Sequence, residues 1–119
     1  MTQEVWPTEI RLLTAEKILE IEFDDGKTFR LPAELLRVET PSAEAKGHGG
    51  EPRKIVSGKR NVDIAALEPV GNYAIRILFD DGHDTGIYSW RILRALGEEQ
   101  DKVWRRYLDT LAEKRLTRG

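Results

Sequence analysis

The 119-residue chain is long enough for one compact domain with a modest core, and 39% of its residues are hydrophobic. Its 19 basic and 21 acidic residues leave a net charge of -2, which argues against binding nucleic acid or an anionic membrane through overall charge. The chain contains no cysteine, which excludes disulfides, thiol nucleophiles, thiolate zinc sites and iron–sulfur ligation. We expect residues 1–119 to form a single domain.

The N-terminal residues include no basic segment followed by an apolar stretch, as a secretory signal would require. No run approaches the roughly 18 apolar residues that a membrane-spanning helix needs. We therefore expect a cytoplasmic protein with no membrane partner.

Alternating polar and apolar residues predict three strands in the first part of the chain, over 9–12, 19–23 and 28–31. The sequence Asp24-Asp25-Gly26 between the last two is typical of a tight hairpin turn. Glycine accepts a positive φ there, and aspartate can hydrogen-bond its local backbone. A proline at the first helical position predicts a short helix over 32–37.

Residues 39–52 are small and polar and include several glycines and prolines, which predicts a long loop. A brief strand is expected over 54–56 and a turn over 57–61. Another strand is expected over 62–67, followed by a turn at 69–72.

The segment 72–90 predicts a strand, a tight acidic turn, a short second strand and the start of a helix. In its first strand, Tyr73, Ile75, Ile77 and Phe79 would share one face. Because the other face also carries apolar residues, we expect this strand to be central in its sheet.

A helix is expected over 91–96, capped by Gly97. A C-terminal helix is expected over 98–115, where apolar residues recur at three- and four-residue spacing. This apolar stripe fits packing on its own domain and pairing with a second copy equally well. The predicted fold class is α+β, with small antiparallel sheets built from two Asp-Asp-Gly hairpins, a short helix after each hairpin and a C-terminal helix.

The chain contains an internal repeat. Ile21-Glu22-Phe23-Asp24-Asp25-Gly26 matches Ile77-Leu78-Phe79-Asp80-Asp81-Gly82, and Leu35-Leu36-Arg37 matches Ile92-Leu93-Arg94. Two interpretations stay open. A hairpin followed by a helix is common enough to occur twice by chance, or the two copies form a pseudo-repeated module whose hairpins pack together.

His83 is the residue around which candidate chemistry gathers, because Asp80, Asp81 and Asp84 lie beside it. A facial metal site needs two histidines and a carboxylate, so His48, His83 and Asp84 form the one such set that the composition permits. In the alternative interpretation, which we favour, the aspartates build turns and His83 bonds a backbone carbonyl.

His83 could also act as a general base, since it is the side chain that titrates near neutral pH. No nucleophile motif or phosphate-binding glycine loop accompanies it. We therefore predict no catalytic residue, no enzyme activity and no cofactor. Tyr88 and Trp90 are expected in the core, unless exposure marks them as part of a partner site.

Several segments spread over residues 8–96 together resemble the gamma-butyrobetaine hydroxylase N-terminal-like family. They are Phe23-Asp24-Asp25-Gly26, Leu31-Pro32-Ala33-Glu34-Leu35-Leu36-Arg37-Val38, Pro41-Ser42-Ala43-Glu44, Gly47-His48, Glu68-Pro69-Val70-Gly71-Asn72-Tyr73-Ala74, and Phe79-Asp80-Asp81-Gly82-His83-Asp84-Thr85-Gly86-Ile87-Tyr88-Ser89-Trp90. The resemblance implies a small α+β module. Such modules occur alone in bacteria, ahead of the catalytic domain of iron- and 2-oxoglutarate-dependent carnitine-pathway oxygenases, and attached to some P-loop iron–sulfur cluster carriers of the Mrp type.

In those oxygenases the module holds a structural zinc through three cysteines and one histidine. By resemblance, the cysteines would fall near Thr40, Ser42 and Ala45, and the histidine at His83. Only His83 is present here, so the resemblance implies no zinc. The oxygenases' iron ligands lie in a separate domain, so hydroxylase activity is not implied either.

The same correspondence implies that the loop after Arg37 lies against the second hairpin. Hydrogen bonds among Thr40, Ser42, Glu44 and His83 would then replace the metal.

We therefore predict a non-enzymatic accessory or protein-interaction module acting beside an iron–sulfur cluster carrier or an oxygenase-like partner. The predicted partner-binding surface comprises the second hairpin and the facing loop: Arg37, Pro41, Glu44, His83, Asp84, Tyr88 and Trp90. The alternative is a metal-binding protein that uses His83, His48 and nearby carboxylates such as Asp84.

Overall fold

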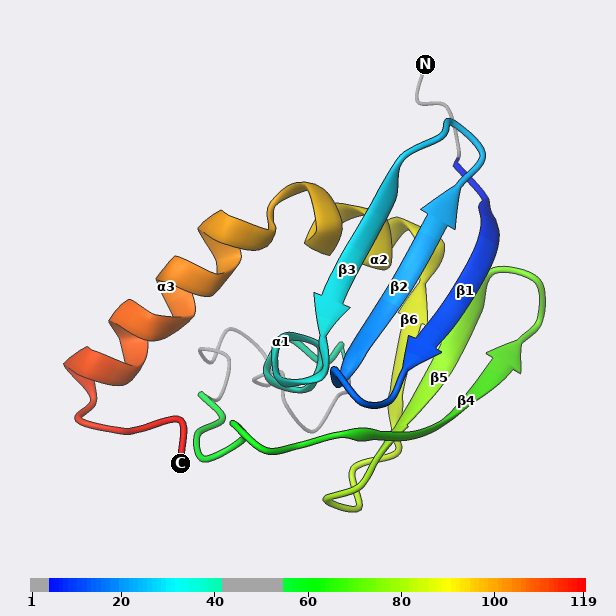
Figure 1. Ribbon diagram of the computed structural model, residues 1–119. Helices are drawn as coiled ribbons and strands as arrows, with labels where there is room; N and C mark the ends of the chain where they lie inside the picture. The colour runs from blue at the N-terminus through cyan, green and yellow to red at the C-terminus, as the bar shows by residue number, and fades with distance from the viewer. Residues whose placement is uncertain (1–4, 42–54) are drawn as a thin grey trace, which may run out of the picture.

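The computed structural model describes residues 5–41 and 55–119 and shows an α+β fold, as predicted (Figure 1). Two three-stranded antiparallel sheets lie one across the other, accompanied by short helices and a C-terminal helix. The elements are β1 Pro7–Leu13, β2 Ile18–Phe23, β3 Thr28–Pro32, α1 Ala33–Val38, β4 Ile64–Val70, β5 Ala74–Phe79, β6 Gly86–Ser89, α2 Trp90–Glu98 and α3 Gln100–Glu113. In the described parts of the chain, no helix is long and apolar enough to cross a membrane.

Each sheet has its strands in chain order, β1-β2-β3 and β4-β5-β6, so β2 and β5 are the central strands. The prediction of a central strand within 72–79 is therefore confirmed. Along β2, Leu19, Ile21 and Phe23 are buried and alternate with two partly exposed glutamates. This alternation follows from the strand pleat, which points successive side chains to opposite faces of the sheet.

One hydrophobic core joins the two sheets. Leu19 and Ile21 of β2 belong to the same buried cluster as Ile75 and Ile77 of β5. Full burial of each such side chain contributes roughly 1.5–3 kcal/mol to folding, before the cost of ordering the chain. The interpretation in which the two hairpins pack together is therefore confirmed.

The repeat extends to individual backbone hydrogen bonds. In the two Asp-Asp-Gly turns, Phe23 N donates to Lys27 O and Phe79 N donates to His83 O, both at 2.9 Å. The glycine of each turn has a positive φ, 84° in the first and 92° in the second. These values lie in the left-handed region that glycine accepts without steric cost.

The two helices that follow the hairpins begin in the same way. Ala33 N donates to Lys17 O at 2.9 Å, and Trp90 N donates to Tyr73 O at 3.1 Å. Ala33 and Lys17 in the first half of the chain therefore correspond to Trp90 and Tyr73 in the second. From these helix starts onward, each residue of α1 has its counterpart 57 positions later in α2.

The structure corrects several predicted boundaries. Pro32 precedes α1 as its N-cap and does not occupy the first helical position. Residues 55–57 form no strand. The strand β4 continues through Pro69, which an edge strand tolerates because only one side of it is hydrogen-bonded. Tyr73 lies in the following turn and is 55% exposed, although we expected it to face the core.

The predicted glycine cap of the helix after the second hairpin is also wrong. Gly97 lies inside α2, which ends at Glu98, and α3 spans a shorter range than the predicted 98–115. A Cβ atom on Gly97 would lie 2.5 Å from Phe29 Cγ. The glycine therefore allows α2 to approach the ring of Phe29 on β3.

Candidate functional site

The turn of the second hairpin is held to the first half of the chain by charge. The Asp81 carboxylate accepts hydrogen bonds from Arg37 Nε at 2.8 Å and from Lys59 Nζ at 2.6 Å. Burial disfavours ionisation of Asp81, but bonds from Lys59, from the His83 backbone and from Arg37 outweigh it and lower its pKa to about 2. The turn is thereby fixed beside the end of α1.

Thr40 and His83 meet at this turn. Thr40 Oγ1 lies 3.1 Å from His83 Nε2, and Thr40 is fully buried. A Cβ atom on Gly86 would lie 2.5 Å from the same hydroxyl oxygen, so the glycine makes room for it. The expectation that the loop after Arg37 lies against the second hairpin is confirmed for Thr40.

The residues around His83 do not fit the zinc site that was considered because of the family resemblance. The hydroxyl of Thr40, near which the resemblance would place a cysteine, is within hydrogen-bond distance of His83 and is not a thiolate ligand. Ser42 and Glu44, which we expected to join this network, lie outside the described residues.

Tyr88 does not belong to an accessible surface, which corrects its inclusion in the predicted partner-binding set. Its side chain is fully buried, and its hydroxyl donates to Leu36 O in α1. The pleat of β6 explains this position, because Gly86 and Tyr88 both point inward while Ile87 points outward.

The predicted metal set is only partly described. Asp84 is exposed and His83 contacts Thr40, whereas His48 lies outside the described residues. Within residues 5–41 and 55–119, no three histidine or acidic side chains are placed to hold a metal ion.

Trp90 lies at the opposite end of β6 from His83. The intervening strand spans about 13 Å at roughly 3.3 Å per residue. Trp90 Nε1 donates to Asn72 O at 2.9 Å, which fixes the indole beside the turn before β5. The structure therefore divides the predicted surface, placing Arg37, Pro41, His83 and Asp84 toward one end and Trp90 at the other.

A groove of about 910 Å³ opens around Trp90. Its aromatic lining includes Trp6, which is 42% exposed, and Tyr73. The other lining residues are Val5, Asp25, Ser89, Arg91, Arg94, Ala95 and Glu98. The groove thus combines exposed aromatic rings with charged groups of α2 and of the first Asp-Asp-Gly turn.

Arg94 is held in place within this groove. Its guanidinium donates to Asp25 at 2.7 and 3.1 Å, and its Nε lies 3.1 Å from the Glu98 carboxylate. It also lies over the rings of Phe23 and Phe29, 5.1 and 5.3 Å from their centroids. The bonds from Arg94 lower the pKa of Asp25 to about 2.

Arg91, by contrast, makes no ion pair within the parts of the chain that the structure describes. It follows Trp90 in the first turn of α2, where Ser89 Oγ accepts a hydrogen bond from Ile92 N at 3.1 Å. Both carboxylates of the lining, Asp25 and Glu98, pair with Arg94, so Arg91 is the one charged lining group that has no ion-pair partner among the described residues.

The sequence prediction missed most of this groove. Trp6 lies in a segment that carried no strand or helix signal, and Tyr73 was assigned to the core because it continued the alternation of β5. The signal that could have found the groove is the repeat itself. Tyr73 corresponds to Lys17, so the same backbone position is polar in the first half of the chain.

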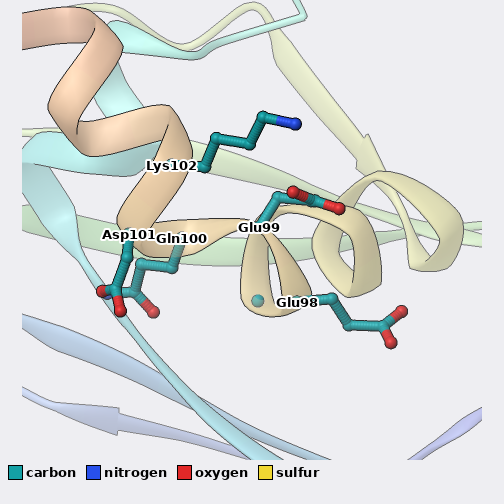
Figure 2. Close-up of a pocket in the computed structure, with 6 residues that line it drawn as sticks. Glu98, Glu99, Gln100, Asp101 and Lys102 are labelled. Carbon is teal, nitrogen blue, oxygen red and sulfur yellow. The ribbon is translucent and has the colours of Figure 1, made fainter.

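A smaller hollow of about 390 Å³ lies at the junction of α2 and α3, where residues 97–102 line it. Figure 2 shows that the labelled side chains do not converge on a common centre: Gln100 and Asp101 extend to one side of the helix junction, and Glu98, Glu99 and Lys102 extend to the other. This hollow therefore has no geometry for holding a ligand.

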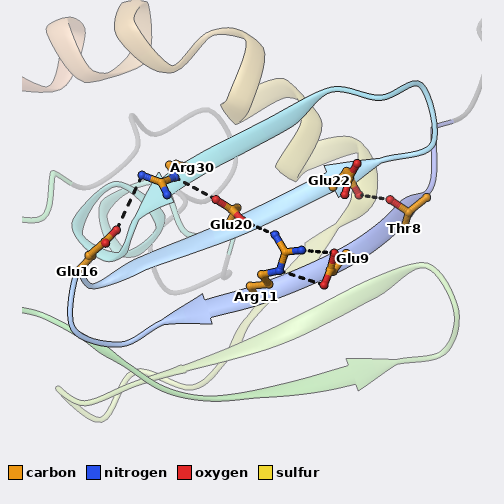
Figure 3. Close-up of polar contacts among 7 residues, drawn as sticks. All are labelled: Thr8, Glu9, Arg11, Glu16, Glu20, Glu22 and Arg30. Atoms are coloured by element: carbon orange, nitrogen blue, oxygen red, sulfur yellow. Dashed lines mark hydrogen bonds and ion pairs between the residues drawn. The ribbon is translucent and has the colours of Figure 1, made fainter.

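The outer face of the first sheet carries a row of ion pairs (Figure 3). Glu20 lies at its centre, 2.7 Å from Arg11 and 3.0 Å from Arg30. Ion pairs between exposed side chains are screened by water and contribute little to stability, so this face is a solvated surface.

Comparison with known proteins gives matches over most of the chain. The model of the gamma-butyrobetaine hydroxylase-like, N-terminal family matches residues 10–94. One solution NMR structure is 40% identical, with a TM-score of 0.85 over 98% of this chain and 91% of that chain. A second NMR structure is 45% identical, with a TM-score of 0.84 over 99% and 90%.

A crystal structure is also similar to this chain. It is of a protein of unknown function that belongs to the DUF971 family, from Acidithiobacillus ferrooxidans. That protein is 43% identical, with a TM-score of 0.65 over 76% of this chain and 91% of that chain. The comparison with curated proteins gave no match.

Proposed function

Because the chain belongs to the gamma-butyrobetaine hydroxylase-like, N-terminal family, we propose that it works as a non-enzymatic protein-interaction module. The observation that carries the proposal is the groove around Trp90, where Trp6 and Tyr73 are each more than two-fifths exposed. Large aromatic side chains that are exposed to solvent are typical of protein-interaction surfaces and of the residues that dominate binding to a protein partner.

Contacts on both sides of the groove support a binding role, because they hold its walls before any partner arrives. Trp90 is fixed by its bond to Asn72 O, and Arg94 is fixed by Asp25 and Glu98. A groove that is already ordered loses little side-chain entropy on binding, which favours affinity.

The partner we propose is an iron–sulfur cluster carrier or an oxygenase-like protein, because modules that resemble this chain are attached to both. The other part of the surface predicted from the sequence, around His83 and Asp84, competes with the Trp90 groove as the contact site. His83 contacts a buried threonine, whereas the aromatic rings of the groove face solvent. We therefore place the main contact at the groove.

The test is quantitative co-purification from the source cell with three forms of the tagged full chain. They are the unaltered chain, a Trp6→Ser and Tyr73→Ser double variant, and a His83→Ala and Asp84→Ala double variant. We expect a defined partner with the unaltered chain and with the His83 variant, and at least a tenfold loss with the groove variant.

Circular dichroism and thermal melts of each variant separate a lost contact from lost folding. Equal recovery of the partner with the folded groove variant would contradict the assignment of the surface. The absence of any stoichiometric partner in all three preparations would contradict the interaction function itself.

A further inference from the structure

The outer faces of α1 and α2 are equivalent surfaces of the two halves, yet residues 5–41 and 55–119 cover only one of them. On α1, Glu34 is 7% exposed and Val38 is also buried. Their counterparts on α2, Arg91 and Ala95, are exposed and line the groove. The repeat therefore provides a direct comparison between a filled site and an open one.

The apolar part of the α1 face is covered by the C-terminal helix and by the segment before β4. Val38 packs in a cluster with Tyr107 and Leu111 of α3, and Ile55 and Val56 pack against the same cluster. Tyr107 also donates its hydroxyl to Val56 O at 2.6 Å, which ties the two covering segments together.

The charged part of the α1 face is covered by an extended tail. Gly58 N donates to Thr117 O at 2.9 Å and Arg60 N donates to Arg118 O at 2.8 Å, so two extended segments run together there. Arg118 then donates two hydrogen bonds to Glu34, at 2.6 and 2.9 Å. The extended tail thus places the guanidinium of Arg118 against the carboxylate of Glu34 on α1.

The α2 face has the opposite charge at the equivalent position. Arg91 stands where α1 has Glu34, and no described residue forms an ion pair with it. Asp25 and Glu98 bring the formal charge of the lining to zero, but both lie within ion-pair distance of Arg94, so neither is paired with Arg91. A complementary segment would therefore carry a carboxylate where the tail carries the guanidinium of Arg118.

We propose that the groove over α2 binds an extended acidic segment of a partner protein, in the manner in which the tail of this chain lies on α1. A carboxylate of that segment faces Arg91, and its apolar side chains pack on Trp6, Tyr73 and Trp90. The proposal rests on the interaction function proposed above and specifies the chemistry of the partner at the same groove.

The test selects ligands from random 12-residue peptides displayed on phage, with the full chain immobilised. We expect the enriched peptides to carry an aspartate or glutamate next to an apolar residue. An Arg91→Glu variant is expected to reverse the preference and enrich lysine or arginine at that position. The matched control is Arg105→Glu, which removes an exposed arginine of α3 outside the groove and should leave the preference unchanged.

The most enriched peptide is then titrated into ¹⁵N-labelled protein and followed by NMR. We expect shifts at Trp6, Tyr73 and Trp90, and about tenfold weaker binding for Arg91→Glu than for Arg105→Glu. Binding should also weaken as salt is raised, because the Arg91 contact is exposed to screening.

Failure to enrich any peptide, or enrichment without an acidic preference, would overturn the proposal. If the unaltered chain dimerises in analytical ultracentrifugation and the groove double variant does not, the occupant is a second copy and the proposal is likewise wrong. If no peptide binds the unaltered chain but recovery of the co-purified partner still depends on Trp6 and Tyr73, this inference alone is wrong. If no peptide binds and no partner is recovered, the interaction function is wrong as well.

Discussion

Asp25 accepts two hydrogen bonds from Arg94, although the two residues lie in different halves of the chain. Their counterparts, Asp81 and Arg37, form the reciprocal contact at 2.8 Å. Each Asp-Asp-Gly turn is therefore held by the arginine of the other half's helix. This exchange explains why the repeated residues include an aspartate of the turn and an arginine of the helix.

Replacement of Arg94 tests the exchange. Arg94→Met keeps much of the apolar stem but removes the bonds to Asp25 and the cation over the Phe23 and Phe29 rings. We expect the free energy of unfolding to fall by roughly 1–3 kcal/mol, measured by urea denaturation. Arg91→Met is the control on the same helix and should change the free energy of unfolding by less than about 0.5 kcal/mol. Equal effects of the two substitutions would contradict the role assigned to Arg94.

The ionisation of Asp81 gives a dependence of stability on pH. Its pKa falls from an ordinary value of 3.8 to about 2 in the folded chain. Between these values the unfolded chain binds a proton that the folded chain does not, so stability falls as pH is lowered through this interval. Above it, ionised Asp81 stabilises the fold.

The measurement for this prediction is urea denaturation of the unaltered chain and of Asp81→Asn between about pH 2 and pH 7. The unaltered chain should be more stable by about 1 kcal/mol near neutrality, a value reduced for solvent screening. The difference should shrink as pH approaches 2. A difference that is constant across this range would show that Asp81 titrates normally in the folded chain.

Gly97→Ala tests the close approach of α2 to β3. In an exposed helix, alanine would stabilise by up to about 1 kcal/mol relative to glycine. Here the added Cβ would lie 2.5 Å from Phe29 Cγ, so we expect a loss of roughly 1–3 kcal/mol instead. The loss should be smaller in a Phe29→Leu background, because the smaller side chain can move aside. A gain in stability for Gly97→Ala alone would refute the contact.

Local patterns sufficed for the two hairpins and their turns but not for which segment covers which surface. The alternation of Leu19, Ile21 and Phe23 and the two Asp-Asp-Gly turns predicted the hairpins, because both signals depend on neighbouring residues. The contact between Thr40 and His83 was expected only through the family resemblance. No local pattern relates residues that are 43 positions apart.

The exposure of Trp6 and Tyr73 escaped prediction, and Tyr88, although expected in the core, was also placed in the partner-binding surface. All three depend on which segment lies over a given face. Tyr88 is covered because its hydroxyl reaches Leu36 O in the other half of the chain. Tyr73 is exposed because the position that would continue the β5 alternation falls in a turn. Tertiary placement decides such cases, and an aromatic residue fits either environment.

The most direct test of the central claim, that the α2 face is open to a partner while the α1 face is closed, is photo-crosslinking in the source cell. A photoreactive phenylalanine analogue replaces Tyr73 in one chain and its counterpart Lys17 in another. Lys17 Nζ donates to Asn61 O, so its replacement should crosslink within the chain. The Tyr73 replacement should crosslink to a separate protein. Intrachain adducts at both positions, or a partner adduct at Lys17 alone, would contradict the account.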